Sequence, residues 1–197
     1  MKKAVLALLL ITATFFSEPA TMISTEAKQV PEKKVCNAVE QSETKDYFYY
    51  EVPEEFQRNG GEMPTELQEF TQKLCEERCI SYPLILAVIE KETGYRNITG
   101  DGDSSTGYMQ VMQKWHEERM EKLGVTDLSI PEENITVGID FLVELFEKYG
   151  EVEMVLMAYN MGESRAKELW ADGIYSSKYS RYIVEREAEI SLEIYGR

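Results

Sequence analysis

A glutamate at position 92 stands where an apolar helical stripe ends, a place that suits a proton-donating carboxyl group. Ile85, Val88, Ile89 and Glu92 recur at spacings of three and four residues, whereas Glu90 falls on the opposite side of the same helix. Partial burial disfavours the charged carboxylate and raises its pKa. The pattern therefore predicts Glu92 as a general acid, although a glutamate that merely reaches solvent from the core edge would show the same periodicity.

Helices are predicted to position this glutamate, and no strand of any length is predicted. Ser81 and Gly94 should bound the helix that carries Glu92, and Ser129 and Gly150 should bound another. Further helices are predicted around residues 67–74, from Val152 to about Tyr159, from Glu163 to Ala171, and from Tyr179 to Tyr195. The Gly-, Asp- and Ser-rich loop at 97–107 leaves room for at most a small hairpin. The predicted fold class is mainly α.

Five short motifs follow one another along these helices. They are Glu92-Thr93-Gly94-Tyr95, Gly107-Tyr108-Met109-Gln110-Val111-Met112, Pro131-Glu132-Glu133-Asn134-Ile135 with Gly138, Ala158-Tyr159-Asn160-Met161-Gly162, and Tyr179-Ser180-Arg181-Tyr182-Ile183. In this order they resemble the soluble-lytic-transglycosylase (SLT) domain of the lysozyme superfamily, over roughly Glu66 to Ala188. Thr93, Tyr108 and Gln113 stand where that family usually has Ser, Leu and Pro, and none of these changes removes a group that the chemistry needs.

The resemblance implies a lysozyme-like helical domain that cuts peptidoglycan glycan strands around one carboxylate. Glu92 would protonate the glycosidic oxygen and later take a proton back. The positions expected to bind the substrate are Thr93, Met109, Gln110, Tyr159, Asn160 and Tyr182. Among these, Met109 and Gln110 would line the cleft, Tyr159 and Asn160 would reach toward Glu92 and the N-acetyl group, and Tyr182 would help close the site. Met109 and Tyr159 could equally be core residues, and Asn160 part of a helix end.

The family is understood to use a single catalytic glutamate with help from the substrate. The acetamido group of N-acetylmuramic acid would stabilise the charge at C1, and the C6 hydroxyl would then form a 1,6-anhydro end. The loop 100–111 also looks like that of goose-type lysozymes, in which an aspartate at the position of Asp101 is thought to hold water. Asp101 would then make the protein a muramidase that hydrolyses the same β-1,4 bond. Asp101 and Asp103 could instead be turn residues or bind Ca²⁺.

The amino-acid composition limits the kinds of partner and ligand that the protein is expected to bind. The 197 residues include 21 basic and 36 acidic ones, for a net charge of −15. This balance argues against nucleic acid and against docking on an anionic membrane. No cofactor and no metal site are expected. Cys75 and Cys79 share a helix face, but a metal would need more ligands than two thiols, and the single histidine, His116, is distant in sequence. With Cys36 they permit one disulfide and leave one thiol over.

The first 27 residues predict a secretory signal peptide or an uncleaved N-terminal anchor. Two lysines precede a short apolar run from Ala4 to Phe16, and small and polar residues follow. Residues 28–62 are predicted to be an acidic linker with a tyrosine-rich patch at 47–50, and residues 63–197 the catalytic domain. The protein should therefore be secreted or lie in the cell envelope, outside the cytoplasm. The acidic charge and the lack of a wall-binding repeat favour a partner in an envelope or secretion machine. The alternative outside the enzymes is a non-catalytic glycan-binding or assembly module of such a machine.

Overall fold

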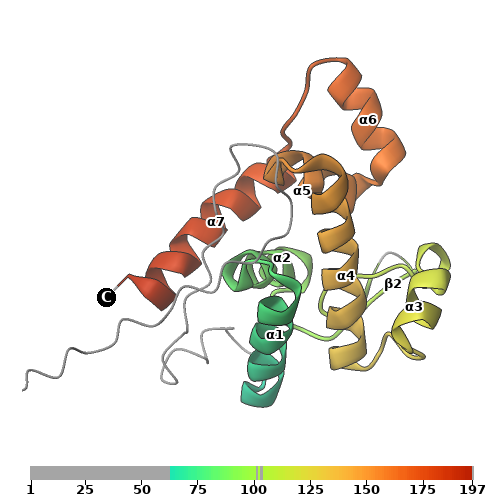
Figure 1. Cartoon of the computed structure of the whole chain (residues 1–197), viewed down its shortest axis with the longest axis vertical. Helices are drawn as coiled ribbons and strands as arrows, with labels where there is room; N and C mark the ends of the chain where they lie inside the picture. The colour runs from blue at the N-terminus through green and yellow to red at the C-terminus, as the bar shows by residue number, and fades with distance from the viewer. Residues whose placement is uncertain (1–62, 101, 103, 197) are drawn as a thin grey trace, which may run out of the picture. The chain divides into compact units, whose positions relative to one another are not determined.

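The computed structural model describes residues 63–100, 102 and 104–196, which form seven α-helices, a 3-10 turn and one small hairpin (Figure 1). The helices are α1 Thr65–Arg78, α2 Tyr82–Thr93, α3 Glu117–Leu123, α4 Pro131–Tyr149, α5 Val152–Met161, α6 Glu163–Ala171 and α7 Lys178–Tyr195. Strands β1 (Thr99–Gly100) and β2 (Ser105–Thr106) pair antiparallel, and the 3-10 turn η2 spans Gln113–Trp115. The predicted mainly α class with a small hairpin is confirmed. The predicted signal peptide and linker, Cys36 and Asp101 lie outside the described residues.

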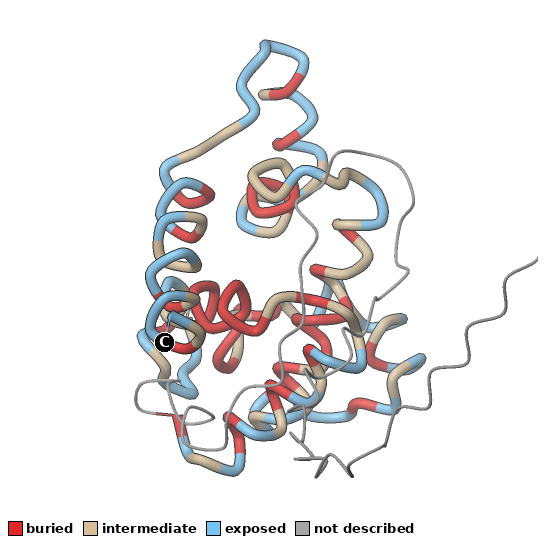
Figure 2. The backbone as a smooth tube through the Cα atoms, turned by 60° about the vertical axis from the view of Figure 1, so that its left-hand side comes forward, coloured by how far each residue is buried: buried red, intermediate tan, exposed pale blue. Residues whose placement is uncertain are grey.

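Helix α2, which carries Glu92, is surrounded by other elements. Every residue from Tyr82 to Ile89 is buried, as the tube in Figure 2 indicates, and a helix that is apolar all round is stable only inside a core. Ser81 begins α2 because its hydroxyl accepts a hydrogen bond from the Leu84 amide at 3.2 Å. Gly94 ends it with a left-handed backbone, φ +58°. Both predicted boundaries of α2 are confirmed.

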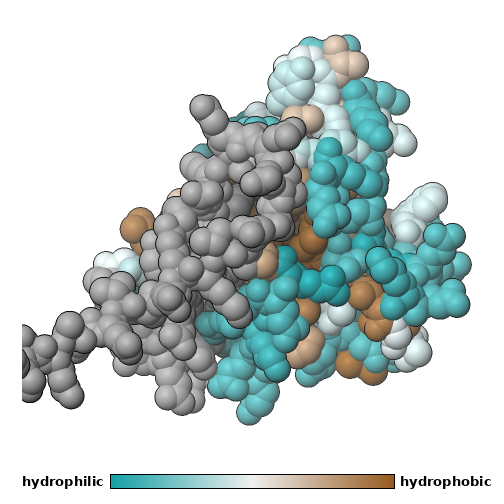
Figure 3. Space-filling model, in the orientation of Figure 1, coloured by the Kyte–Doolittle hydropathy of each residue, from teal (hydrophilic) through white to brown (hydrophobic). Residues whose placement is uncertain are grey.

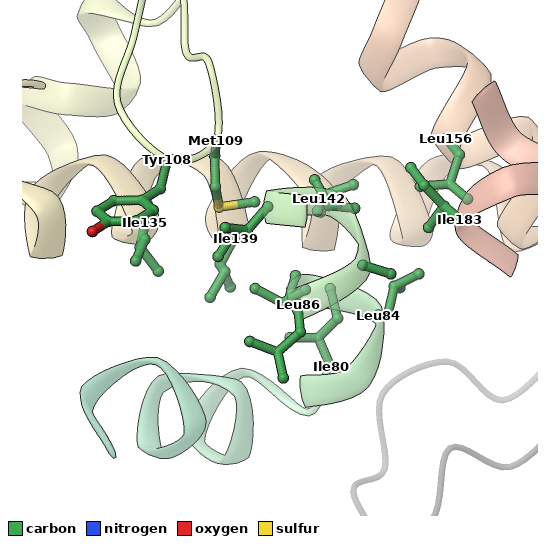
Figure 4. Close-up of a cluster of buried hydrophobic side chains, with 14 of the residues drawn as sticks. Ile80, Leu84, Leu86, Tyr108, Met109, Ile135, Ile139, Leu142, Leu156 and Ile183 are labelled. Atoms are coloured by element: carbon green, nitrogen blue, oxygen red, sulfur yellow. The ribbon is translucent and has the colours of Figure 1, made fainter. Parts of the chain in front are cut away.

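The core forms where α2 meets its neighbours. Helix α2 packs against α7 and α1, and α4 packs against α1 and α5. Figure 4 shows Leu84 and Leu86 of α2 near Ile139 and Leu142 of α4, with Ile183 of α7 nearby; each of these side chains is fully buried. Burying one such side chain contributes about 1.5–3 kcal/mol, so the position of Glu92 is fixed by the packing of several helices.

The predicted start of the α4 helix is wrong by one residue. The N-cap is Ile130, with no side-chain cap, and Pro131 is the first helical residue. Ser129 lies in the preceding turn instead, where its amide donates to the Asp127 carboxylate at 2.8 Å. Proline sets the boundary because its missing N–H costs nothing at the first helical position. The short helix α3 was not predicted at all.

Two further features of the described residues are the polarity of the surface and the state of two cysteines, Cys75 and Cys79. On the visible face, hydrophilic residues predominate among the described residues in Figure 3. No helix within the described ranges is long and apolar enough to cross a membrane. Cys75 is a free thiol with no exposed surface, and burial, together with the charge of Glu76, raises its pKa. Cys79 is disulfide-bonded.

Candidate active site

Glu92 lies in the last turn of α2, where the chain leaves the helix through two left-handed residues. Gly94 and Tyr95 have φ of +58° and +61°, a conformation that a tyrosine adopts only when its surroundings hold it there. Thr93 is buried, and its hydroxyl lies 3.1 Å from the Ile89 carbonyl oxygen and 3.2 Å from that of Tyr108. Thr93 therefore fixes the end of α2, beside the Glu92 carboxyl, to the loop at residues 107–110.

The Glu92 carboxylate receives a hydrogen bond from a tyrosine of another helix. Tyr179 Oη donates to Glu92 Oε1, and Tyr179 stands in the first turn of α7, which Ser177 and Ser180 hold with reciprocal hydrogen bonds. Burial and the nearby charge of Glu92 raise the pKa of Tyr179 and of Tyr159 well above the usual value for tyrosine. Both phenols thus stay protonated at neutral pH. Tyr179 donates a hydrogen bond to Glu92, whereas Tyr159 donates to the Met109 carbonyl.

The second carboxylate of this helix, Glu90, has a different environment. It accepts hydrogen bonds from Arg186 Nε at 2.9 and 3.0 Å, from Tyr95 Oη at 3.0 Å and from Tyr182 Oη at 3.0 Å. Partial burial opposes ionisation, but these hydrogen bonds and the charge of Arg186 lower the pKa of Glu90. Helix α7 therefore gives Glu92 a neutral hydroxyl and gives Glu90 a cation, which keeps Glu90 ionised and unsuited to donate a proton.

Met109 is held on three sides in the loop beside Thr93. Its amide donates to Asn134 Oδ1 at 2.9 Å and its carbonyl accepts from Tyr159 Oη at 2.7 Å. Its side chain is fully buried against Gly138, where an added Cβ would lie 2.5 Å from the Met109 sulfur. Asn134 also donates to the Thr106 carbonyl at 2.7 Å. Met109 thus joins the hairpin loop to α4 and α5.

Gln110 braces the hairpin with its side-chain amide. Oε1 accepts from Ser105 Oγ at 2.7 Å, and Nε2 donates to the carbonyls of Ile98 and Gly107 at 3.0 and 2.9 Å. An added Cβ at Gly100 would lie 2.1 Å from Gln110 Oε1. The Gln110 backbone is left-handed, φ +48°, and the three hydrogen bonds offset the strain of that conformation. Both ends of the Gln110 amide are thus engaged within the hairpin.

Two predicted site residues remain, Asn160 and Asp101. Asn160 is exposed near the end of α5, one residue after Tyr159. Asp101 lies outside the described residues. Within the described part of the chain, no group of three or more His, Cys, Asp or Glu side chains is placed to hold a metal ion.

Comparison with known proteins identifies the family. A family model described as "Transglycosylase SLT domain" matches residues 69–180, more than half of the chain. The chain belongs to this family. A transglycosylase of Enterobacteria phage PRD1 is 32% identical over 83 residues, which are 42% of this chain and 30% of the relative, so the chain spans less than a third of that relative's length.

A solved structure agrees in fold. It is the X-ray structure of the lytic transglycosylase Slt from Pseudomonas aeruginosa, an inactive glutamate-to-glutamine mutant. The TM-score is 0.57 at 18% sequence identity, with 66% of this chain and 25% of that chain covered. At this identity the likeness shows the fold alone. The predicted membership of the SLT family and the predicted lysozyme-like fold are confirmed.

The structure brings together some of the residues that the SLT motifs predicted for the site, and separates one. Thr93 joins the loop to α2, and Met109 joins it to Tyr159 of α5. Tyr159 lies close enough to Glu92 for the carboxylate to affect its pKa. The Tyr182 hydroxyl binds Glu90 instead of Glu92. The predicted roles of these residues toward substrate stay predictions. The residue that sequence reasoning missed is Tyr179, which opens the same SLT motif as Tyr182.

An aromatic stack runs from the site to the single histidine. The Tyr159 ring lies 5.5 Å from that of Phe141, which meets the His116 ring edge-on at 4.7 Å. Burial and then the charge of Arg119 lower the pKa of His116 to about 4, although Glu144 acts in the opposite direction. His116 is therefore neutral at physiological pH, and protonating it would place a second cation beside Arg119.

Replacing His116 with glutamine is expected to reduce the acid sensitivity of the fold. The folded pKa of about 4 lies below the ordinary value of 6.5, so the unfolded chain binds the proton more readily. Stability that is present above pH 6.5 is then lost as the pH falls toward 4. Because the ring is partly exposed, we expect the wild type to lose about 1–2 kcal/mol more than His116→Gln over this range. Urea unfolding of both proteins at the two pH values measures this difference, and an equal loss in both would contradict it.

Proposed function

We propose that residues 63–197 form a lytic transglycosylase domain that acts on peptidoglycan. The bond cleaved is the β-1,4 link between N-acetylmuramic acid and N-acetylglucosamine, and the product carries a 1,6-anhydromuramic end. Glu92 is the single catalytic acid and base. The observation that carries this proposal is the contrast on α2: Glu92 accepts a tyrosine hydroxyl, whereas Glu90 is held ionised by Arg186.

One carboxyl group is enough for the proposed reaction. Glu92 gives its proton to the glycosidic oxygen as the bond to C1 of N-acetylmuramic acid breaks. The acetamido oxygen of that N-acetylmuramic acid bonds to C1 at the same time. The carboxylate of Glu92 then takes the proton of the C6 hydroxyl, whose oxygen replaces the acetamido oxygen at C1. Glu92 regains its proton, and no water is consumed. The Tyr179 hydroxyl stabilises the intermediate state, in which Glu92 is charged.

The relatives support this reading in two ways. The phage protein is named a transglycosylase, and the solved structure is of a lytic transglycosylase that is inactive as a glutamate-to-glutamine mutant. Both names support a transglycosylase reaction, and the inactive mutant supports its dependence on one glutamate. The substrate lies outside the cytoplasm, so we infer that the domain works there. A partner in an envelope or secretion machine stays a prediction from the acidic charge, and it would be contradicted if the purified protein cleared whole walls efficiently at physiological salt.

Product analysis in heavy-oxygen water tests the outcome of the reaction. Purified peptidoglycan digested by the protein is expected to give muropeptides with anhydro ends, one water lighter than reducing ends and free of heavy oxygen. The reason is that the C6 hydroxyl supplies the oxygen that joins C1. Mass spectrometry of the soluble fragments makes this measurement.

A hydrolytic muramidase serves as the reference digestion, in which every new end carries the label. If the protein itself gave only labelled reducing ends, the transglycosylase proposal would be wrong. The muramidase alternative, with Asp101 holding the water, would then take its place. If no fragments formed, a non-catalytic glycan-binding module would be the better description.

A further inference from the structure

Helices α2 and α7 pack against each other, and three polar contacts join them. Ser81 Oγ, before the start of α2, donates to Glu187 of α7 at 2.7 Å. The Glu90–Arg186 ion pair follows at 2.9 Å. At the far end, Tyr179 donates to Glu92. Of the other two contacts, the ion pair is the nearer to the proposed catalytic group, because Glu90 is two residues from Glu92 on α2.

The apolar contacts between these helices do not by themselves fix how far α7 lies along α2. Ile183, Ile190 and Ile194 are buried on the inner side of α7, but hydrophobic burial is non-directional. The ion pair has direction and is only about a quarter exposed, with side-chain exposures of 25% for Arg186 and 22% for Glu90. Partial burial weakens screening by salt. The guanidinium is also held on its own helix by Glu189 at 2.9 Å.

Tyr179 and Arg186 lie on the same side of α7, because seven residues make almost two full turns. A shift of α7 that separates Arg186 from Glu90 therefore moves the Tyr179 hydroxyl relative to Glu92. We infer that the Glu90–Arg186 pair is a positioning contact for the reaction, which holds the Tyr179 hydroxyl on the Glu92 carboxyl. Arg186 acts through Tyr179, and it does not touch the substrate. This inference rests on the proposed role of Glu92.

A double-mutant cycle tests the inference in the full-length protein. Arg186→Met is expected to lower kcat about 5- to 10-fold with little change in KM, because the acid loses a stabilising hydroxyl while substrate binding is retained. In a Tyr179→Phe background, where that hydroxyl is already absent, Arg186→Met should lower kcat less than about 2-fold further. The measurement is the rate of muropeptide release, with folding checked by circular dichroism.

Three variants sharpen the cycle. Arg181→Met removes an exposed arginine of the same helix, whose guanidinium binds Ser176 at 3.0 Å, and should leave kcat unchanged in both backgrounds. Arg186→Lys keeps a cation and should recover part of the rate. If Arg186→Met fails to fold, Glu90→Gln breaks the same pair and should show the same dependence on background.

The outcomes separate this inference from the proposed function. Equal losses of kcat from Arg186→Met in both backgrounds would mean that the pair is merely structural, and the inference would be wrong. An unchanged kcat in the wild-type background would overturn it as well. If Glu92→Gln retained full activity, the proposed function would fail first, whereas an inactive Glu92→Gln protein with an additive cycle would remove the inference alone.

Discussion

Glu92→Gln is expected to lower the rate of glycan cleavage by roughly three orders of magnitude, in keeping with the loss of a general acid. Glutamine has nearly the shape of glutamate and can still accept the Tyr179 hydrogen bond, but it cannot give up or take the proton. Because the proposed reaction uses this one carboxyl group twice, no other group on α2 replaces it. Release of soluble muropeptides from purified peptidoglycan, measured at matched folding by circular dichroism, gives the rate.

The neighbouring Glu90→Gln variant provides the contrast. It also removes one carboxylate from α2, but that carboxylate is committed to Arg186, Tyr95 and Tyr182. Its rate should fall by no more than about 10-fold, through the position of α7. An exposed carboxylate on α1, Glu69, serves as the control whose replacement should change nothing. Retention of wild-type activity by Glu92→Gln would contradict the assignment, whatever the result at Glu90.

Gly107→Ala is expected to destabilise the fold by about 3 kcal/mol, or about 10 °C in Tm. The new Cβ would lie 2.2 Å from Asn134 Cγ, on a residue with φ +77°. Asn134 cannot move aside, because it is fully buried and its amide holds Met109 and Thr106. Overpacking and left-handed backbone strain therefore add. Thermal unfolding followed by circular dichroism measures the change.

Gly124→Ala is the matched control for this substitution. Gly124 also has a left-handed backbone, φ +71°, but an added Cβ there would meet nothing within 4 Å. It should cost only the backbone strain, about 1 kcal/mol. The difference between the two alanine variants then measures the contact with Asn134. Equal losses would show that this contact contributes nothing to stability.

Much of the fold was predictable because helix boundaries depend on local chemistry. Ser81 and Gly94 bound α2 as expected, and the 3.6-residue period separated Glu92 from Glu90. The choice of tyrosine was not predictable. Tyr179 and Tyr182 are three residues apart on α7, and which hydroxyl meets Glu92 depends on how far α7 lies along α2. That depends on the packing of two helices, on which local sequence carries no information.

The residues that hold the loop at 107–110 could not be predicted from local sequence either. Gln110 was expected to line the cleft, which stays a prediction, and its hydrogen bonds within the hairpin were not predicted. Asn134 belonged to a recognised motif without any predicted role, and it holds the loop from α4. In both cases the side chain binds a backbone group from another part of the sequence, Ile98 for Gln110 and Met109 for Asn134. Such partners leave no periodic signal. Ser129 is not the cap of α4 because Pro131 is itself the first helical residue, which makes Ile130 the N-cap.

The contacts at Met109 limit how sequences of this kind can diverge. Gly107 is small because Asn134 fills the adjoining space, and Gly138 is small because Met109 fills it. Asn134 in turn serves the backbone of Met109 itself. A larger residue at 138 would need a smaller one at 109, and a side chain at 107 would need a different partner for the Met109 amide. Evolution and design therefore act on these four positions as a set, and substitutions tested one at a time will underestimate the variety that the fold accepts.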